Sequence, residues 1–209
     1  MVGLVIVILV GYFAGAIPFS YIAGKVCAGI DLREQGSGNL GASNTFRYLG
    51  PWIAMLVLAG DVAKGFVPAY FAPDLAATSE LPGHWLMLAA GFFAVIGHMF
   101  SVFVGFRGGK GIATTAGAFL ALAPLALLWA FAVWALVLLP TRIVSVASIS
   151  AAGALPVVVF VLDLLGYASY HWSLLALSVA IAVAVIVKHR SNIQRLMAGQ
   201  EPALGRHKE

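Results

Sequence analysis

The sequence predicts an all-α integral membrane protein with about seven transmembrane helices, and three observations lead to this fold class. First, 62% of the 209 residues are hydrophobic and only 10% are charged, whereas a soluble domain carries roughly 25% charged residues. Second, the mean hydropathy is +0.99, and the apolar residues form runs that approach or exceed the roughly 20 residues a helix needs to span a bilayer. Third, most of the charged residues lie between these runs.

The apolar runs follow one another with polar segments between them. The first is not expected to be a signal peptide, because it lacks a preceding basic region and an evident cleavage site. No soluble domain fits anywhere, so we expect one polytopic membrane domain over residues 1–209. In order, the runs cover residues 3–24, 51–72, 85–106, 112–139, 143–162 and 172–187.

The stretch 112–139 contains Pro124 and is either one long span or two short spans. Basic residues concentrate on the cytoplasmic side of membrane proteins. With two spans, eleven of the twelve basic residues face one side, and the opposite loops hold acidic residues but no Lys or Arg. We therefore expect seven spans, two of them short and tilted or re-entrant, with the N-terminus outside and the C-terminus cytoplasmic. The eleven are Lys25, Arg33, Arg47, Arg107, Lys110, Arg142, Lys188, Arg190, Arg195, Arg206 and Lys208.

Cysteine content and charge exclude some classes of protein and leave others open. A single cysteine, Cys27, excludes an internal disulfide framework and a multi-cysteine metal site. No metal ion or cofactor is expected, because neither a carboxylate cluster nor a His pair occurs at ligand spacing on the inner side. The net charge of +4 is compatible with nucleic acid, anionic lipid or an anionic substrate. The positions of the cations decide among these.

Three polar, glycine-bearing segments, residues 36–47, 97–114 and 188–201, face the cytoplasm in this topology. In the first, glycines free the backbone to turn tightly and to expose N–H groups that form an anion-binding nest. A guanidinium binds phosphate in a bidentate manner. The segment therefore predicts a phosphate site, with Gly36, Ser37, Gly38, Asn39, Asn44 and Arg47 as candidate residues.

The second segment combines a histidine, a lysine and several glycines. It superficially resembles a nucleotide-binding loop, but Gly111 stands where that motif requires Ser or Thr, and this excludes an NTPase. The glycines still allow close backbone approach beside a cation. An isolated histidine is usually a packed, hydrogen-bonded residue, and its place beside the lysine favours a site role. The candidates are His98, Gly108, Gly109, Lys110, Gly111 and Thr114.

Polar residues inside or next to spans form the remaining candidates. Asp61 and Lys64 lie three residues apart, share a helix face and are either a structural ion pair or functional residues. Ser145 and Ser148 follow Arg142 at helical spacing, although serines in spans commonly bond their own backbone. The third segment adds Asn192 and Arg195.

The three segments resemble the cytoplasmic motifs of the bacterial acyl-phosphate:glycerol-3-phosphate acyltransferases, the PlsY family. Residues 36–47 match the pattern G-S-G-N-x-G-A-x-N-x-x-R at every fixed position. Residues 97–114 resemble G-H-x-F…F-x-G-G-K-G-x-A-T, and 192–201 resemble N-I-x-R-L-x-x-G-x-E. The resemblance covers the whole chain, with two mild departures: Ser101 replaces a common proline and Lys188 a frequent arginine.

The resemblance implies transfer of a fatty acyl group from acyl phosphate to the 1-hydroxyl of sn-glycerol 3-phosphate, giving lysophosphatidic acid and phosphate. It implies direct attack, with Ser37 hydrogen-bonding a substrate and a covalent role for Ser37 less favoured. Arg47 and Lys110 would bind phosphate, Asn192 and Arg195 would hold glycerol phosphate, and His98 and Asn44 would orient neighbours. The implied partners are these substrates and membrane lipid, without nucleic acid or an obligate protein partner. The implied location is the bacterial inner membrane, with the site facing the cytoplasm.

Two readings from other classes remain open at this point. A small transporter or channel for an organic anion would also combine spans, the Asp61–Lys64 pair and basic glycine loops, but its outer loops would be richer in polar residues. A non-catalytic lipid-binding protein would explain the cytoplasmic cations but not their amide- and glycine-rich setting. Formation of lysophosphatidate by the purified protein separates the enzyme from both alternatives.

Overall fold

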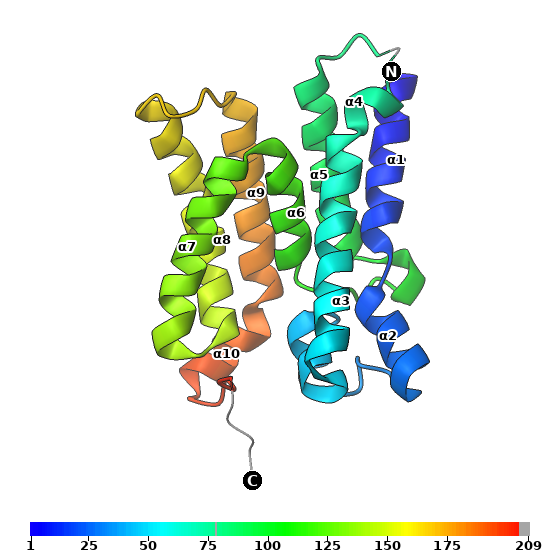
Figure 1. Ribbon diagram of the computed structural model, residues 1–209, viewed down its shortest axis with the longest axis vertical. Helices are drawn as coiled ribbons and strands as arrows, with labels where there is room; N and C mark the ends of the chain where they lie inside the picture. Colours follow the sequence, from blue (N-terminus) through cyan, green and yellow to red (C-terminus); the bar gives the residue numbers. More distant parts are fainter. Residues whose placement is uncertain (78, 205–209) are drawn as a thin grey trace. The chain divides into compact units, whose positions relative to one another are not determined.

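The computed structural model describes residues 1–77 and 79–204, and all regular secondary structure in this part of the chain is helical (Figure 1). This confirms the all-α prediction. Arg206 and Lys208, which were included among the cytoplasmic basic residues, lie outside the described residues. The helices are α1 (Val2–Ala16), α2 (Phe19–Ala28), α3 (Ala42–Tyr70), α4 (Ala72–Leu75), α5 (Gly83–Met99), the 3-10 helix η1 (Val102–Val104), α6 (Ile112–Leu122), α7 (Pro124–Thr141), α8 (Val144–Leu164), α9 (Trp172–Lys188) and α10 (Arg190–Met197).

Within residues 1–77 and 79–204, five helical segments are long and apolar enough to cross a membrane: Val2–Ala28, Ala42–Tyr70, Gly83–Val104, Pro124–Thr141 and Val144–Leu164. The pair α9 and α10, bent by 55°, qualifies as a sixth, and α6 is a shorter apolar helix. With α6, the described helices give five or six candidate spans and one shorter apolar helix, in line with about seven spans, but only one of the two predicted short spans is short. The prediction that 112–139 divides near Pro124 is confirmed, because α6 ends at Leu122 and Pro124 begins α7. The second half is longer than expected, since α7 has 18 residues and continues through Pro140.

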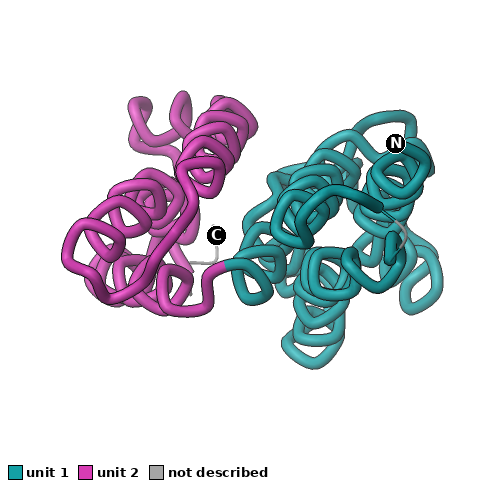
Figure 2. The backbone as a smooth tube through the Cα atoms, turned by 90° about the horizontal axis from the view of Figure 1, so that it is seen from above, with its two compact units in different colours: residues 1–122 teal, residues 123–209 magenta. Residues whose placement is uncertain are grey.

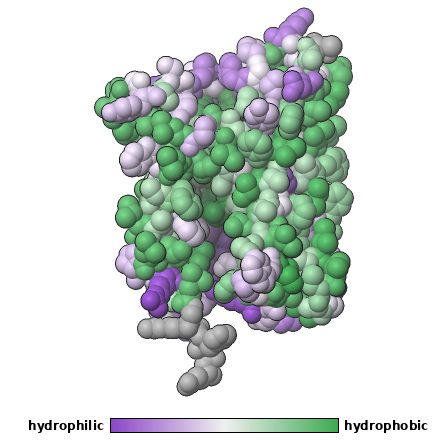
Figure 3. All heavy atoms as spheres, in the orientation of Figure 1, coloured by the Kyte–Doolittle hydropathy of each residue, from purple (hydrophilic) through white to green (hydrophobic). Residues whose placement is uncertain are grey.

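By their contacts, the helices form two compact units, residues 1–122 and 123–209, where the sequence predicted one polytopic domain (Figure 2). In the first unit, α1 packs against α5, and α3 packs against α6 and α5. In the second unit, α8 packs between α7 and α9. On the face shown in Figure 3, hydrophobic residues cover most of each unit, and most hydrophilic residues gather near the helix ends. Large apolar side chains such as Trp52 and Leu136 are more than 70% exposed (76% and 72%), which suits helices that contact lipid.

Glycines allow the helices of the first unit to approach closely. A Cβ atom at Gly15 of α1 would lie 2.0 Å from the carbonyl oxygen of Ala94 in α5. One at Gly117 of α6 would lie 1.9 Å from the carbonyl oxygen of Val62 in α3. Side chains at these positions would push the helices apart, so small residues hold the backbones in contact.

Two predicted boundaries differ from the structure. The first apolar run is not one helix, because α1 ends at Ala16 and α2 begins at Phe19, with Pro18 between them. Proline has no N–H to continue the hydrogen-bond ladder and favours a break here. Residues 36–47 were expected to form a loop, but α3 begins at Ala42, so only the first half of this segment is non-helical. At Gly50, φ is +79°, which bends α3 just after this segment.

Candidate functional site

Asn44 shapes the turn at residues 36–41, which leads into α3. Its side chain is only 1% exposed. The amide nitrogen donates to the carbonyl oxygens of Leu32 and Gln35, both at 3.1 Å. The amide oxygen accepts from the backbone N–H of Ser37 at 3.3 Å. Asn44 therefore orients its neighbours, because these three bonds go to the backbone in and just before the turn.

The turn exposes the groups predicted to bind phosphate. Gly36 and Gly38 have φ values of +56° and +65°, a region that suits glycine because it has no Cβ. The Ser37 hydroxyl accepts from the backbone N–H of Asn39 at 3.4 Å. Ser37 and Arg47 are both exposed. Ser37 and Arg47 therefore lie at the surface, whereas the Asn44 amide that holds the backbone is buried.

Segments 36–47 and 97–114 meet at Gly109. The backbone N–H of Gly109 donates to the carbonyl oxygen of His98 at 3.0 Å. A Cβ atom at Gly109 would lie 2.2 Å from Nε2 of His98 and 2.2 Å from the carbonyl oxygen of Leu40. Gly109 is therefore held between the imidazole of one segment and the backbone of the other. Leu32, Leu40 and Val104 form a hydrophobic cluster that also joins the two segments.

Arg33, which precedes the first segment, forms a second connection to residues 97–114. Its guanidinium binds the Asp31 carboxylate, with Nη2 at 2.6 Å from Oδ2, and donates to the carbonyl oxygen of Val104 at 3.1 Å. It also lies over the ring of Tyr21, 5.0 Å from the centroid. The side-chain hydrogen bond from Arg33 outweighs burial and lowers the pKa of Asp31 to about 2. The pKa of Arg33 is raised by the same pair, so both groups stay charged at neutral pH.

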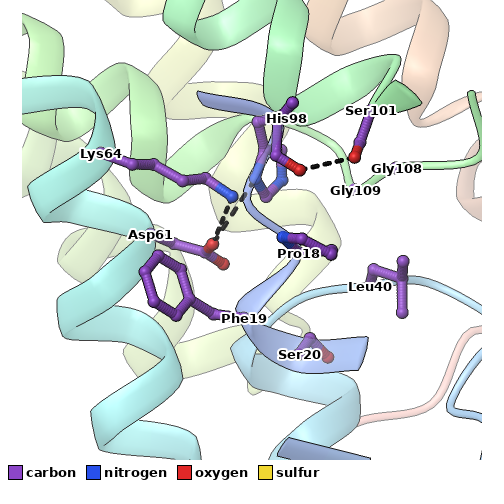
Figure 4. A pocket seen from close by; sticks show the side chains of 11 residues that line it. Pro18, Phe19, Ser20, Leu40, Asp61, Lys64, His98, Ser101, Gly108 and Gly109 are labelled. Carbon is purple, nitrogen blue, oxygen red and sulfur yellow. Dashed lines mark hydrogen bonds and ion pairs between the residues drawn. The ribbon is translucent and has the colours of Figure 1, made fainter. Parts of the chain in front are cut away.

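Asp61 and Lys64 of α3 form a buried ion pair beside Gly109 (Figure 4). Nζ of Lys64 lies 2.7 Å from Oδ1 of Asp61, and the two side chains are 4% and 3% exposed. Nζ also donates to the carbonyl oxygen of Ile17 at 2.8 Å. Nδ1 of His98 lies 3.6 Å from the same Asp61 oxygen. The pair predicted from the sequence is therefore formed, and it also contacts two further elements.

The break between α1 and α2 is anchored by small hydroxyl side chains. Ser101 Oγ donates to the carbonyl oxygen of Ala16, which ends α1. Ser20 of α2 and Thr45 of α3 share a hydrogen bond of 2.8 Å between their hydroxyls. These buried contacts attach the break to both candidate segments. Ser20 and Ser101 line a small pocket together with residues that include Asp61, Lys64, His98, Gly108 and Gly109.

Lys110 and Gly111 immediately precede α6. Gly111 has φ of +85°, and Lys110 is half-buried. The first turn of α6 directs backbone N–H groups and a partial positive charge toward this loop. Thr114 in that turn is 0% exposed, and its hydroxyl has no hydrogen-bond partner among the described residues. This combination suits an anion.

In the second unit, Glu201 gathers the candidate residues of the third segment. Its Oε1 accepts from Ser145 at 2.7 Å and also from the amide of Asn192, while Oε2 accepts from Nε of Arg195 at 2.7 Å. Burial by itself would raise the pKa of the Glu201 carboxyl, but these three hydrogen bonds hold it below its ordinary value. Ser148 is buried at 3% exposure one turn after Ser145.

Several of these residues were absent from the sequence-based candidates. Glu201 is the acidic residue that ends a basic segment, and that contrast was a usable signal. His189 is 3% exposed, and its Nδ1 lies 2.8 Å from the carbonyl oxygen of Val185. The spacing of Asp31 and Arg33 also indicated a local pair. Ser20 and Ser101 carried no signal, because single serines near apolar runs are common.

The predicted residues divide between the two units. The first unit holds the candidates of segments 36–47 and 97–114 together with Asp61 and Lys64, and its contacts at Gly109 join them. The second unit holds Ser145, Ser148, Asn192 and Arg195, three of which bind Glu201. Each group is internally ordered by its own hydrogen bonds.

Comparisons with known proteins agree with the family resemblance found in the sequence. A family model described as glycerol-3-phosphate acyltransferase matches residues 5–199. Curated proteins named glycerol-3-phosphate acyltransferase include one from Geotalea daltonii, 41% identical over 94% of this chain and 95% of its own. Another, from Trichlorobacter lovleyi, is 44% identical, covering 91% of this chain and 92% of its own.

Two solved structures are also similar to this chain. Both are described as crystal structures of PlsY (YgiH), an integral membrane glycerol 3-phosphate acyltransferase. The glycerol 3-phosphate form has a TM-score of 0.86 and 37% identity, covering 97% of this chain and 96% of that one. The lysophosphatidic acid form has a TM-score of 0.83 and 36% identity, with coverages of 97% and 95%.

Proposed function

The chain belongs to the glycerol-3-phosphate acyltransferase family and is an acyltransferase, and we propose that acyl phosphate is its donor and that transfer is direct. The acceptor is the 1-hydroxyl of sn-glycerol 3-phosphate, and the products are lysophosphatidic acid and inorganic phosphate. The observation that best supports a site for phosphate substrates is the meeting of two cationic glycine segments at Gly109.

In the proposed step, the hydroxyl oxygen of glycerol 3-phosphate attacks the acyl carbonyl carbon, and a new carbon–oxygen bond forms. The bond from that carbon to the phosphate oxygen breaks, and phosphate leaves with the electron pair. The hydroxyl proton passes to a substrate phosphate oxygen. Since phosphate is already a good leaving group, the enzyme mainly needs to position the substrates and stabilise charge.

The residues of the first unit suit that task. Lys110 supplies an ammonium group at the N-terminus of α6, and Arg47 supplies a guanidinium group on α3. We propose that both bind phosphate and that the backbone of Gly108–Gly111 cradles it. Ser37, exposed in its turn, hydrogen-bonds a substrate phosphate or hydroxyl. Asn44 orients that turn through its bonds to Leu32, Gln35 and Ser37.

Asn192 and Arg195 are proposed to help hold glycerol 3-phosphate. Their hydrogen bonds to Glu201 support this role, because the carboxylate fixes both side chains near the start of the last segment. A guanidinium whose Nε is already bound to a carboxylate keeps a defined orientation, which lowers the entropy lost when it binds an anion. Ser145 donates to the same carboxylate and so belongs to this group of side chains.

The protein is a multi-pass membrane protein, and we propose that the site faces the cytoplasm of a bacterial inner membrane. The distribution of basic residues supports this orientation, with the N-terminus outside and the C-terminus inside. A reporter fused after Arg142 is expected to read as cytoplasmic. An external reading at that position would overturn the proposed topology.

The donor and the mechanism are tested with purified protein in detergent. With acyl phosphate and radiolabelled glycerol 3-phosphate, labelled lysophosphatidate is expected, whereas equal concentrations of acyl-CoA or acyl-carrier protein give none. Incubation with labelled acyl phosphate alone is expected to leave Ser37 unmodified. Product from acyl-CoA would contradict the proposed donor, and an acylated Ser37 that is turned over by glycerol 3-phosphate would contradict direct transfer.

A further inference from the structure

The Asp61–Lys64 pair has no direct role in the proposed reaction, yet it is a costly feature. Both side chains are less than 5% exposed (3% and 4%) and lie in the middle of α3. Removing two charges from water costs several kcal/mol per ion, and apolar residues of similar size often serve stability equally well. A charged pair inside a membrane span therefore calls for an explanation other than stability.

The ammonium group of Lys64 holds the break in the first span. Because Pro18 interrupts the helix, the carbonyl oxygen of Ile17 accepts from the backbone of the described residues only the short-range N–H of Phe19 (3.2 Å). A carbonyl within a membrane span has no water to bond, and Nζ of Lys64 provides a partner at 2.8 Å. The ring of Phe19 lies 5.7 Å from Nζ. Lys64 therefore fastens the start of α2 to α3.

The carboxylate of Asp61 faces the imidazole of His98 on α5. Oδ1 lies 3.6 Å from Nδ1, so its negative charge favours the tautomer with hydrogen on that nitrogen. The other ring nitrogen, Nε2, lies against Gly109. Gly108 is equally confined, because a Cβ atom there would lie 1.9 Å from the carbonyl oxygen of His98. Asp61 thus acts on the glycine loop through one intervening side chain.

We infer that the Asp61–Lys64 pair is a positioning device. It holds in place segments 36–47 and 97–114, which form the part of the proposed glycerol 3-phosphate site that lies in the first unit. Lys64 sets the position of Ser20, whose hydroxyl bonds Thr45 at the start of α3. Asp61 sets the orientation of His98 and hence the position of Gly108 and Gly109. The expected change in kinetics rests on the proposed function. The control of the His98 orientation by Asp61 does not depend on that function.

The test compares Asp61→Asn, Lys64→Met and the double variant with wild type. Asp74→Asn is the matched control, because it removes an exposed carboxylate from α4, away from the pair. Each single variant leaves one buried charge uncompensated and is expected to lower the thermal unfolding midpoint and to raise KM for glycerol 3-phosphate at least fivefold. The double variant has no buried charge imbalance, so it regains thermal stability but keeps the raised KM.

KM distinguishes positioning from mere stability, because it does not depend on how much of the protein is folded. KM for acyl phosphate is expected to change less, since the acyl tail contributes binding outside the loop. A double variant with wild-type KM, or single variants that change only the maximal rate, would overturn the inference. The control variant is expected to match wild type in both KM and midpoint.

A second readout needs no catalysis. The ring nitrogens of His98 are observed by ¹⁵N NMR of histidine-labelled protein and assigned by their loss in His98→Gln. Asp61→Asn is expected to shift these signals toward the other tautomer, while Asp74→Asn leaves them in place. Unchanged His98 signals in Asp61→Asn would overturn the inference. Wild-type protein that makes no lysophosphatidate would instead refute the proposed function and leave the NMR comparison decisive.

Discussion

Lys110→Ala is expected to lower kcat/KM for acyl transfer by about 100- to 1000-fold, the usual cost of removing one preorganised group that stabilises charge in a transition state. Lys110 lies in the loop before α6, where a helix N-terminus and the glycine backbone already favour an anion. Its ammonium charge would offset the negative charge of two phosphate substrates held close together. The measurement is the rate of lysophosphatidate formation over a range of both substrates.

Lys25→Ala is the matched control for this prediction. Lys25 is an exposed basic residue in the last turn of α2, outside the three segments. Its removal changes the net charge by the same amount and is expected to leave kcat/KM within about twofold of wild type, as for an ordinary surface substitution. Wild-type activity in Lys110→Ala would leave the assignment as an acyltransferase intact but would contradict the proposed role of Lys110 in binding phosphate.

Gly109→Ala is expected to reduce kcat/KM by roughly 100-fold, because misplacement of a reacting group by about 1 Å costs that much. The new methyl group would stand 2.2 Å from both Nε2 of His98 and the carbonyl oxygen of Leu40. Because the contact with Leu40 is with its backbone, rotation of the His98 side chain alone cannot make room for the methyl group. The two segments must therefore separate, which moves Lys110 away from Ser37 and its turn.

Gly153→Ala provides the control for added volume and altered backbone entropy. Gly153 lies inside α8, and a Cβ atom there would meet no heavy atom of the described residues within 4 Å. Alanine is favoured over glycine in a helix by roughly 1 kcal/mol, so this variant is expected to be fully active and slightly more stable. The kinetics and the circular dichroism spectra of both variants are compared at equal protein concentration. A Gly109→Ala enzyme with wild-type kinetics would show that the junction adjusts freely.

Local rules applied to the sequence predicted much of this protein correctly. Hydropathy identified the helical membrane fold, since the cost of exposing apolar residues to water depends mainly on their number and order. Pro124 correctly marked the division between α6 and α7. Pro18 did the same between α1 and α2 without being recognised, because one apolar run continues across it. The start of α3 at Ala42 was also missed, since glycine and amide residues dominate that stretch.

For the predicted site residues, the structure adds how their side chains are held, while their roles stay predictions. Spacing alone paired Asp61 with Lys64, because residues three apart share a helix face. That Lys64 also binds Ile17, and Asp61 faces His98, depends on α3 packing against the elements around it. The roles proposed for Ser37, Arg47 and Lys110 stay predictions until the variants are measured.

By itself, the sequence determined the membrane class, the order of the spans and the cationic glycine segments that suit phosphate, because these follow from composition and short-range pattern. Only the tertiary structure decided that Gly109 lies between His98 and Leu40, and that Glu201 gathers Ser145, Asn192 and Arg195. These contacts join residues far apart in the chain. Their geometry depends on how the helices pack, to within the size of a methyl group. Short-range sequence patterns do not predict such packing.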